Sequence, residues 1–258
     1  MTGFLPGWHE LIFAFAAFFL SHILPARPTV REWLIRLAGK NCYLWAYAAL
    51  SIVLFGWLIV AADRAPYIAL WQFSPWQTWI PNVAMPFACL LLAFGIATPN
   101  PLSIASRNDE TFDPESPGIA GVTRHPVLWA AAFWAFAHVV PNGDLAHLLL
   151  FGSFGAFSLL GMLAIDTRNQ RRLGTAKWHY LSRNTSLVPL VGLAGGGWRP
   201  SFRPSDLVRL IVAASLYVGM SDFSRCISRS SACRPFRFNS ANDRVSQELW
   251  ATARLSWH

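Results

Sequence analysis

The feature that most constrains this chain is a series of apolar segments, each nearly long enough to cross a bilayer. A helix needs roughly 20 apolar residues to span a hydrocarbon core of about 30 Å. Such segments lie at residues 11–24, 42–62, 81–98, 126–140 and 145–165, with a weaker sixth at 207–220. Only 13% of the 258 residues are charged, against about a quarter in a soluble domain. We therefore predict an all-α, polytopic transmembrane helical bundle of five to six spans.

Basic residues are distributed unevenly among the loops. They concentrate after the first, third and fifth apolar segments, whereas the loops between hold only Arg64. The positive-inside rule then places the basic loops in the cytoplasm and the N-terminus outside. The net charge of +8 is explained by this topology, so we predict the lipid bilayer, and no nucleic acid, as a partner.

The composition changes after Met220, where Ser, Arg, Asn and Asp replace the apolar residues. Such a segment cannot bury enough apolar surface to fold alone, and its arginines would lie outside, against the charge rule. We therefore divide the chain into a transmembrane domain, residues 1–220, and a polar Arg/Ser-rich tail, residues 221–258. The tail is expected to be disordered or to arise from a shifted reading frame, and no function is assigned to it.

One stretch, residues 121–145, concentrates the polar residues that chemistry would need. Arg124 is expected at headgroup level, His125 just inside the membrane, and Pro126 in the first helical turn, where its missing N–H costs nothing. Further on, Asn142 and Asp144 lie in a tight turn between two apolar segments. This spacing predicts a helical hairpin in which Asp144 caps the second helix.

Three histidines lie within or beside apolar segments: His22, His125 and His138. Ionisable groups in membrane spans are costly, and they usually face a partner, a cavity or a cofactor. His22 and His125 share a predicted depth near the cytoplasmic ends of their segments. His138 lies 13 residues beyond His125, or roughly 20 Å along a helix axis. Depth therefore favours His22 with His125 as a pair of iron ligands.

The same residues carry a family resemblance. The sequence Thr-Arg-His-Pro at 123–126, Trp-Ala-Phe-Ala-His at 134–138 and Asn-Gly-Asp-Leu at 142–145 resembles the NnrU family of bacterial membrane proteins, as does Ser-His at 21–22. The resemblance implies a bacterial inner-membrane protein linked to denitrification, that is, to nitrite and nitric-oxide reduction. The family is similar to plant 15-cis-zeta-carotene isomerase, which holds haem b through histidines. Carried over by motif, the haem ligands are His22 and His138, with His125 in the Arg-His-Pro position, so the choice between His125 and His138 stays open.

A second resemblance, to isoprenylcysteine and phospholipid methyltransferases, rests on Arg-His-Pro and on residues 173–178. Those enzymes carry paired glutamates where this chain has Asn-Gln-Arg-Arg at 169–172. Basic groups there would repel the sulfonium of S-adenosylmethionine. Three hypotheses therefore remain: a haem-b protein with redox or isomerase-like activity, a non-catalytic accessory factor for membrane nitrogen-oxide reductases, and, disfavoured, a membrane methyltransferase.

Overall fold

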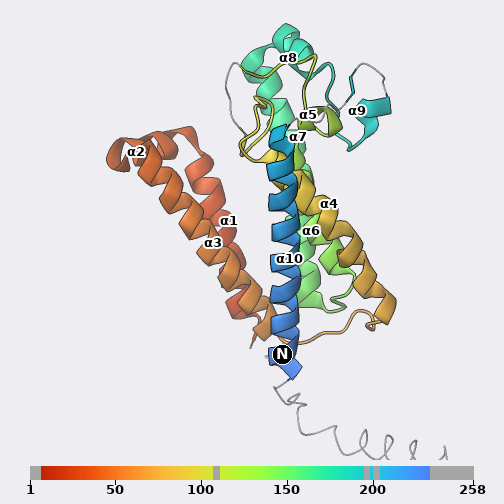
Figure 1. Cartoon of the computed structure of the whole chain (residues 1–258). Coiled ribbons are helices and arrows are strands. Elements are labelled where there is room, and N and C mark those ends of the chain that lie inside the picture. Colours follow the sequence, from red (N-terminus) through yellow and green to blue (C-terminus); the bar gives the residue numbers. More distant parts are fainter. Residues whose placement is uncertain (1–6, 107–110, 195–197, 200–203, 233–258) are drawn as a thin grey trace, which may run out of the picture. The chain divides into compact units, whose positions relative to one another are not determined.

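The structure, a computed structural model, describes residues 7–106, 111–194, 198–199 and 204–232. These residues form helices and loops, and no β-strand occurs among them (Figure 1). In chain order the helices are α1 His9–Ala26, α2 Pro28–Ala38, α3 Lys40–Arg64, η1 Pro75–Thr78, α4 Trp79–Gly95, α5 Ile119–Val122, α6 Pro126–Val139, α7 Leu145–Leu173, α8 Thr175–Ser182, α9 Val191–Ala194 and α10 Pro204–Ala232.

Within the described ranges, three stretches are long and apolar enough to cross a membrane: α3, Pro75–Gly95 and α7. A fourth is reached if α1 and α2 are counted as one bent span. Helix α6 is apolar but only 14 residues long. A helical fold with helices able to cross a membrane is thus confirmed for the described residues, while the five to six spans and the external N-terminus stay predictions.

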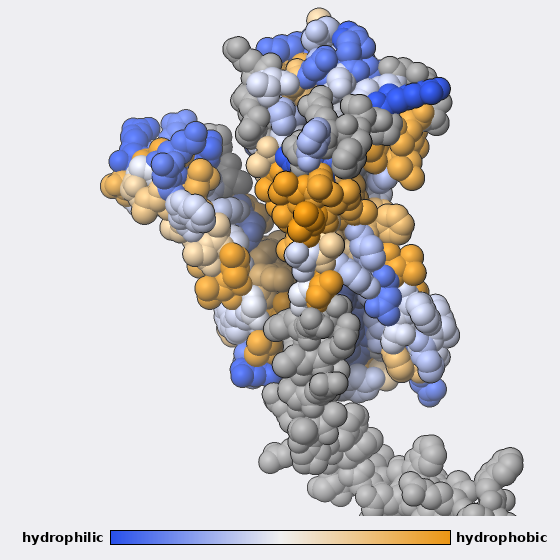
Figure 2. Space-filling model, in the orientation of Figure 1, coloured by the Kyte–Doolittle hydropathy of each residue, from blue (hydrophilic) through white to orange (hydrophobic). Residues whose placement is uncertain are grey.

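The outward faces of these helices are apolar. On α3, Trp45 and Ile52 are 78% and 71% exposed, which is suited to lipid rather than water. Figure 2 shows hydrophilic residues gathered on α2 and around α8.

Helices α1, α3 and α7 share one buried cluster. Small side chains, among them Ala14 on α1, Ala61 on α3 and Ala146 on α7, are almost fully buried in it. Larger side chains such as Leu58 and Leu150 fill the space between these close approaches. Small residues let helix backbones approach closely, which is how helices pack in membranes.

Helix α6 packs between α4 and α7, and small residues again allow the helices to approach closely. Ala132 and Ala135 of α6 are fully buried. A Cβ placed on Gly155 of α7 would lie 2.6 Å from the ring of Phe136 on α6, and one on Gly95 would lie 2.9 Å from the ring of Pro126. Glycine is therefore needed at both positions for the helices to meet.

The predicted hairpin between α6 and α7 is present. The Asp144 carboxylate accepts a hydrogen bond from the backbone N–H of His147 at 3.1 Å and caps α7. The backbone carbonyl of Gly143 holds the loop between α3 and η1, because it accepts a hydrogen bond from the N–H of Leu70 at 2.7 Å. A Cβ on Gly143 would lie 2.2 Å from the carbonyl oxygen of Trp71.

The chain forms two compact units, Met1–Ala214 and Ser215–His258, whose boundary lies within α10. Helix α10 itself continues to Ala232, into the segment that the sequence assigns to the tail. Residues 233–258 and the glycines at 195–197 lie outside the described residues.

Candidate functional site

A buried ion pair joins the segment before α6 to the C-terminal half of α7. Nη1 of Arg124 donates to Oδ2 of Asp166, and these side chains are 13% and 12% exposed. Arg124 also donates from Nε to Oγ1 of Thr185 at 3.0 Å, and its guanidinium lies 4.9 Å from the ring centroid of Trp178. Asp166 lies inside α7, and its carboxylate is held by side chains.

His125 uses both of its ring nitrogens in the same network. Nε2 lies 2.9 Å from Oδ1 of Asp166, and Nδ1 lies 3.0 Å from the hydroxyl of Ser103. A carboxylate only accepts, so Nε2 carries the proton and Nδ1 accepts from Ser103. His125 is 0% exposed. Neither nitrogen is left for a metal ion in this arrangement.

Amide side chains fix the loop that carries Ser103. Asn100 donates to the carbonyl of Arg124 at 3.0 Å and accepts from the N–H of Leu102 at 3.1 Å. Asn169 of α7 donates to the carbonyl of Leu102 at 2.8 Å. We call Arg124, His125 and Asp166, with Ser103, Asn100, Asn169 and Thr185, the polar network.

The loop around Ser103 is also backbone-strained. Ala97 and Ala105 both have positive φ, at 54° and 56°, and the N–H of Ala97 donates to the carbonyl of Ala105 at 2.9 Å. A non-glycine residue in this region costs energy and persists only where its surroundings impose it. The polar network therefore holds the Ser103 loop, α6 and α7 together. It also keeps the His125 imidazole in a single tautomer.

His22, on α1, is bonded differently. Its Nδ1 donates to the carbonyl of Phe18 at 2.7 Å. Its Nε2 lies 3.4 Å from Oγ of Ser51, but that hydroxyl donates its proton to the carbonyl of Tyr47 at 2.8 Å. The shorter bond to Tyr47 therefore leaves Ser51 with at most a weak hydrogen bond to the lone pair of Nε2.

His138, near the end of α6, repeats this pattern. Its Nδ1 donates to the carbonyl of Trp134 at 2.7 Å, four residues earlier as in His22. Among the described residues no group is hydrogen-bonded to its Nε2. The imidazole lies between rings, with centroids 5.6 Å from Trp134 and 5.4 Å from Phe151.

A continuous set of ring contacts joins His22 to His138. The His22 ring stacks on Phe18 with centroids 4.2 Å apart, and Phe18 lies 5.0 Å from Phe154 of α7. Phe154 lies 6.2 Å from Trp134, which contacts His138. We call Phe18, Phe55, Trp134, Phe151 and Phe154 the aromatic cluster; its members come from α1, α3, α6 and α7, and the two histidines border it.

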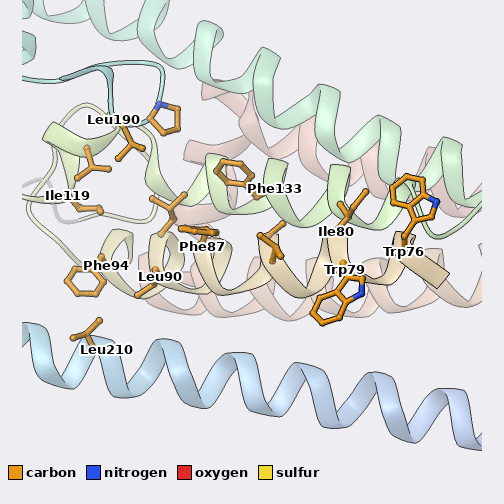
Figure 3. A pocket seen from close by; sticks show the side chains of 15 residues that line it. Trp76, Trp79, Ile80, Phe87, Leu90, Phe94, Ile119, Phe133, Leu190 and Leu210 are labelled. Atoms are coloured by element: carbon orange, nitrogen blue, oxygen red, sulfur yellow. The ribbon is translucent and has the colours of Figure 1, made fainter. Parts of the chain in front are cut away.

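A separate apolar groove follows α4. Its volume is about 1070 Å³, and its lining includes Trp79, Phe87 and Phe94 of α4 with Phe133 of α6 and Leu210 of α10 (Figure 3). Near Phe94 the guanidinium of Arg209 donates to the carbonyl of Ala93 at 2.8 Å. The groove suits a lipid chain.

A family model described as NnrU protein matches residues 10–223. The chain belongs to the NnrU family. Neither the curated proteins nor the solved structures contain a match to it. The matched region runs from α1 into α10, so it includes the polar network and the two histidines that border the aromatic cluster.

In this NnrU chain the predicted site residues fall into three places. Arg124 and His125 join the polar network, and Pro126 begins α6 beside them. Asn142 donates to the carbonyl of His138 at 2.7 Å, at the end of α6, and Asp144 caps α7. His22 and His138 border the aromatic cluster, so His125 lies in a different environment from both.

Sequence reasoning missed the partners of Arg124 and His125. Ser103, Asn100 and Asn169 come from segments whose meeting depends on the fold. One signal was available: Asp166 is the first acidic residue after the long apolar segment at 145–165, and a carboxylate at that depth needs a cation nearby.

Proposed function

We propose that this NnrU family protein serves bacterial denitrification from the inner membrane, as a haem-b protein whose iron is held by His22 and His138. The observation that carries the proposal is the matching state of these two imidazoles. Each donates its Nδ1 proton to a backbone carbonyl at 2.7 Å, so Nε2 is the unprotonated nitrogen in both, and in His22 it has a long contact of 3.4 Å with the Ser51 hydroxyl.

This state is the one that iron ligation requires. A metal-bound histidine almost always donates its other ring N–H to a carbonyl, a carboxylate or water, which fixes the tautomer and raises the basicity of the ligating nitrogen. His22 and His138 meet that condition before any metal is bound. His125 does not, because its Nε2 proton bonds Asp166 and its Nδ1 accepts from Ser103.

The aromatic cluster supplies surroundings that fit a flat, apolar macrocycle. Its rings come from four helices and connect the two imidazoles. They would have to separate for one iron to reach both histidines. Haem b supplies an iron that changes its oxidation state, with a potential set by its axial ligands and the polarity around it.

The test is an absorption spectrum of the detergent-purified protein, oxidised and dithionite-reduced, with haem quantified after extraction. We expect a Soret band and sharp reduced α and β bands in the wild type, and loss of haem in His22→Ala and His138→Ala. His147→Ala is the matched control, since His147 is held by Asp144 and Asp63. A protein that contains no haem when haem is abundant contradicts the proposal.

The link to denitrification needs a separate test in cells. Deletion of the gene is expected to slow nitrite or nitric-oxide consumption, and the His22→Ala and His138→Ala variants should fail to restore it. Restoration by both variants would instead support the alternative, a non-catalytic accessory factor for nitrogen-oxide reductases. The methyltransferase alternative gains no support at Asn169, whose amide donates to the carbonyl of Leu102.

A further inference from the structure

Helix α2 is a short helix set at an angle to its neighbours. It contains 11 residues, Pro28–Ala38, and so extends about 16 Å, which is half of what a membrane crossing needs. The chain turns by 85° between His9–Pro25 and Thr29–Ala38. Gly39, with φ of 79°, then separates α2 from the membrane-spanning α3.

The two faces of α2 differ in chemistry. Val30, Trp33, Leu34 and Leu37 follow the i, i+3, i+4, i+7 spacing that places them on one side of a helix. Arg31, Glu32 and Arg36 fall on the other side. Trp33 and Leu37 are 59% and 66% exposed, so the described residues leave this part of the apolar face uncovered.

The charge on and around α2 is strongly positive. Arg27, Arg31, Arg36 and Lys40 lie within or next to the helix, against a single acid, Glu32. Glu32 lies 3.5 Å from Arg36 as an exposed i, i+4 pair. Among the described residues, no carboxylate lies within ion-pair distance of Arg31 or Lys40, so this surface is available to an anion from outside the chain.

We propose that α2 lies flat in the membrane interface and binds anionic phospholipid headgroups. Trp33 and Leu37 enter the boundary between headgroups and acyl chains, while Arg31 and Arg36, helped by Arg27 and Lys40, face the phosphates. A short helix with an apolar face, an indole and a basic face is the form that interfacial helices take. Basic residues next to a membrane-spanning helix are attracted to anionic lipid.

The alternative geometry for a bent pair is a re-entrant loop that dips into the bilayer. That geometry would carry Arg31, Glu32 and Arg36 into hydrocarbon, where charged side chains are expensive. The flat orientation keeps all three in the headgroup region and still buries Trp33 and Leu37. The positions of the charged residues therefore favour the flat orientation over the re-entrant one. The excess of basic over acidic residues favours anionic over zwitterionic lipid.

The orientation can be measured by spin-label depth in the full chain. Each label is introduced as a single cysteine in a chain whose native cysteines are replaced, in vesicles of phosphatidylcholine with phosphatidylglycerol. Labels at Trp33 and Leu37 are expected at one shallow depth, and labels at Glu32 and Arg36 in water. A depth that increases steadily from Val30 to Leu37 would establish the re-entrant geometry and overturn the proposal. Coupling between labels on two copies would assign the apolar face to a dimer and would also overturn it.

Lipid selectivity is tested with spin-labelled phosphatidylglycerol and phosphatidylcholine. The variant with Arg31→Gln and Arg36→Gln is expected to lose selectivity for the anionic lipid by about fivefold per arginine. Arg64→Gln is the matched control, since Arg64 ends α3 and pairs with Glu10 at 3.2 Å. Equal selectivity in the double variant and the wild type contradicts the role of the arginines. Neither measurement involves haem, so the outcomes of both are independent of the proposed function.

Discussion

The polar network and the aromatic cluster both hold histidines near membrane spans, and they use them in opposite ways. In the polar network both nitrogens of His125 are bonded, to Asp166 and to Ser103. Beside the aromatic cluster, His22 and His138 have Nδ1 bonded to a carbonyl, which leaves Nε2 unprotonated and, in His22, with only a 3.4 Å contact to Ser51. Burial alone therefore does not distinguish a histidine suited to ligate a metal from a structural one, whereas the bonding of each ring nitrogen does.

The largest effect is expected where the polar network loses its shared carboxylate. Asp166→Ala leaves Arg124 and His125 without their acidic partner in a buried setting, and removing one member of a buried pair costs about 3–5 kcal/mol. Thermal unfolding in detergent should show a large fall in midpoint. Glu32→Gln is the control, because the Glu32–Arg36 pair is exposed and such pairs contribute about 0–1 kcal/mol. An unchanged midpoint for Asp166→Ala would show that the network does not hold the helices together.

A pair of substitutions separates the two regions directly. His125→Phe leaves Oδ1 of Asp166 and the hydroxyl of Ser103 without their bonds to the imidazole, although Asp166 keeps Arg124 as a partner, and an unsatisfied buried polar group costs about 1–3 kcal/mol. His138→Phe removes one bond to a helix carbonyl but no side-chain partner, and it replaces the imidazole by another ring beside the aromatic cluster, so we expect a change of less than about 1 kcal/mol.

The measurement is the unfolding free energy of both variants, prepared under haem limitation so that cofactor loss does not contribute. If His138→Phe proved as destabilising as His125→Phe, the distinction between the two histidines would be lost.

A smaller effect than that of His125→Phe is expected at the rim of the polar network. Ser103→Ala removes one hydrogen bond to Nδ1 of His125, which is worth about 0.5–1.5 kcal/mol. Ser153→Ala is a control of the same chemistry, since Ser153 bonds only the carbonyl of Leu150 within α7. A larger loss at Ser153 than at Ser103 would show that the Ser103 bond contributes nothing specific.

Local sequence rules predicted the features that depend on neighbouring residues. Asp144 at the start of α7 and Pro126 at the start of α6 follow from capping and proline geometry. The helical hairpin at residues 141–144 was likewise predicted, from a short polar turn between two apolar segments. Apolar length identified α3 and α7 as spans, because each carries a long uninterrupted apolar segment.

The missed features depend on contacts distant in sequence. Asp166 and Arg124 are 42 residues apart, and Ser103 and His125 are 22 apart, so no local pattern pairs them. Helical depth suggested His22 with His125 as iron ligands, whereas the hydrogen bonds of His125 favour the proposed pair of His22 with His138. The 85° turn before α2 was also missed, because the basic residues there were read only as a topology signal.

The most direct test of the account is rescue of a ligand variant by free imidazole. His138→Gly removes the side chain at the next-to-last residue of α6, where glycine costs the helix little. We predict that this variant loses the six-coordinate haem spectrum and regains it when imidazole is added, whereas His125→Gly keeps its spectrum and does not respond. Loss and rescue in His125→Gly, with His138→Gly unaffected, would contradict the account.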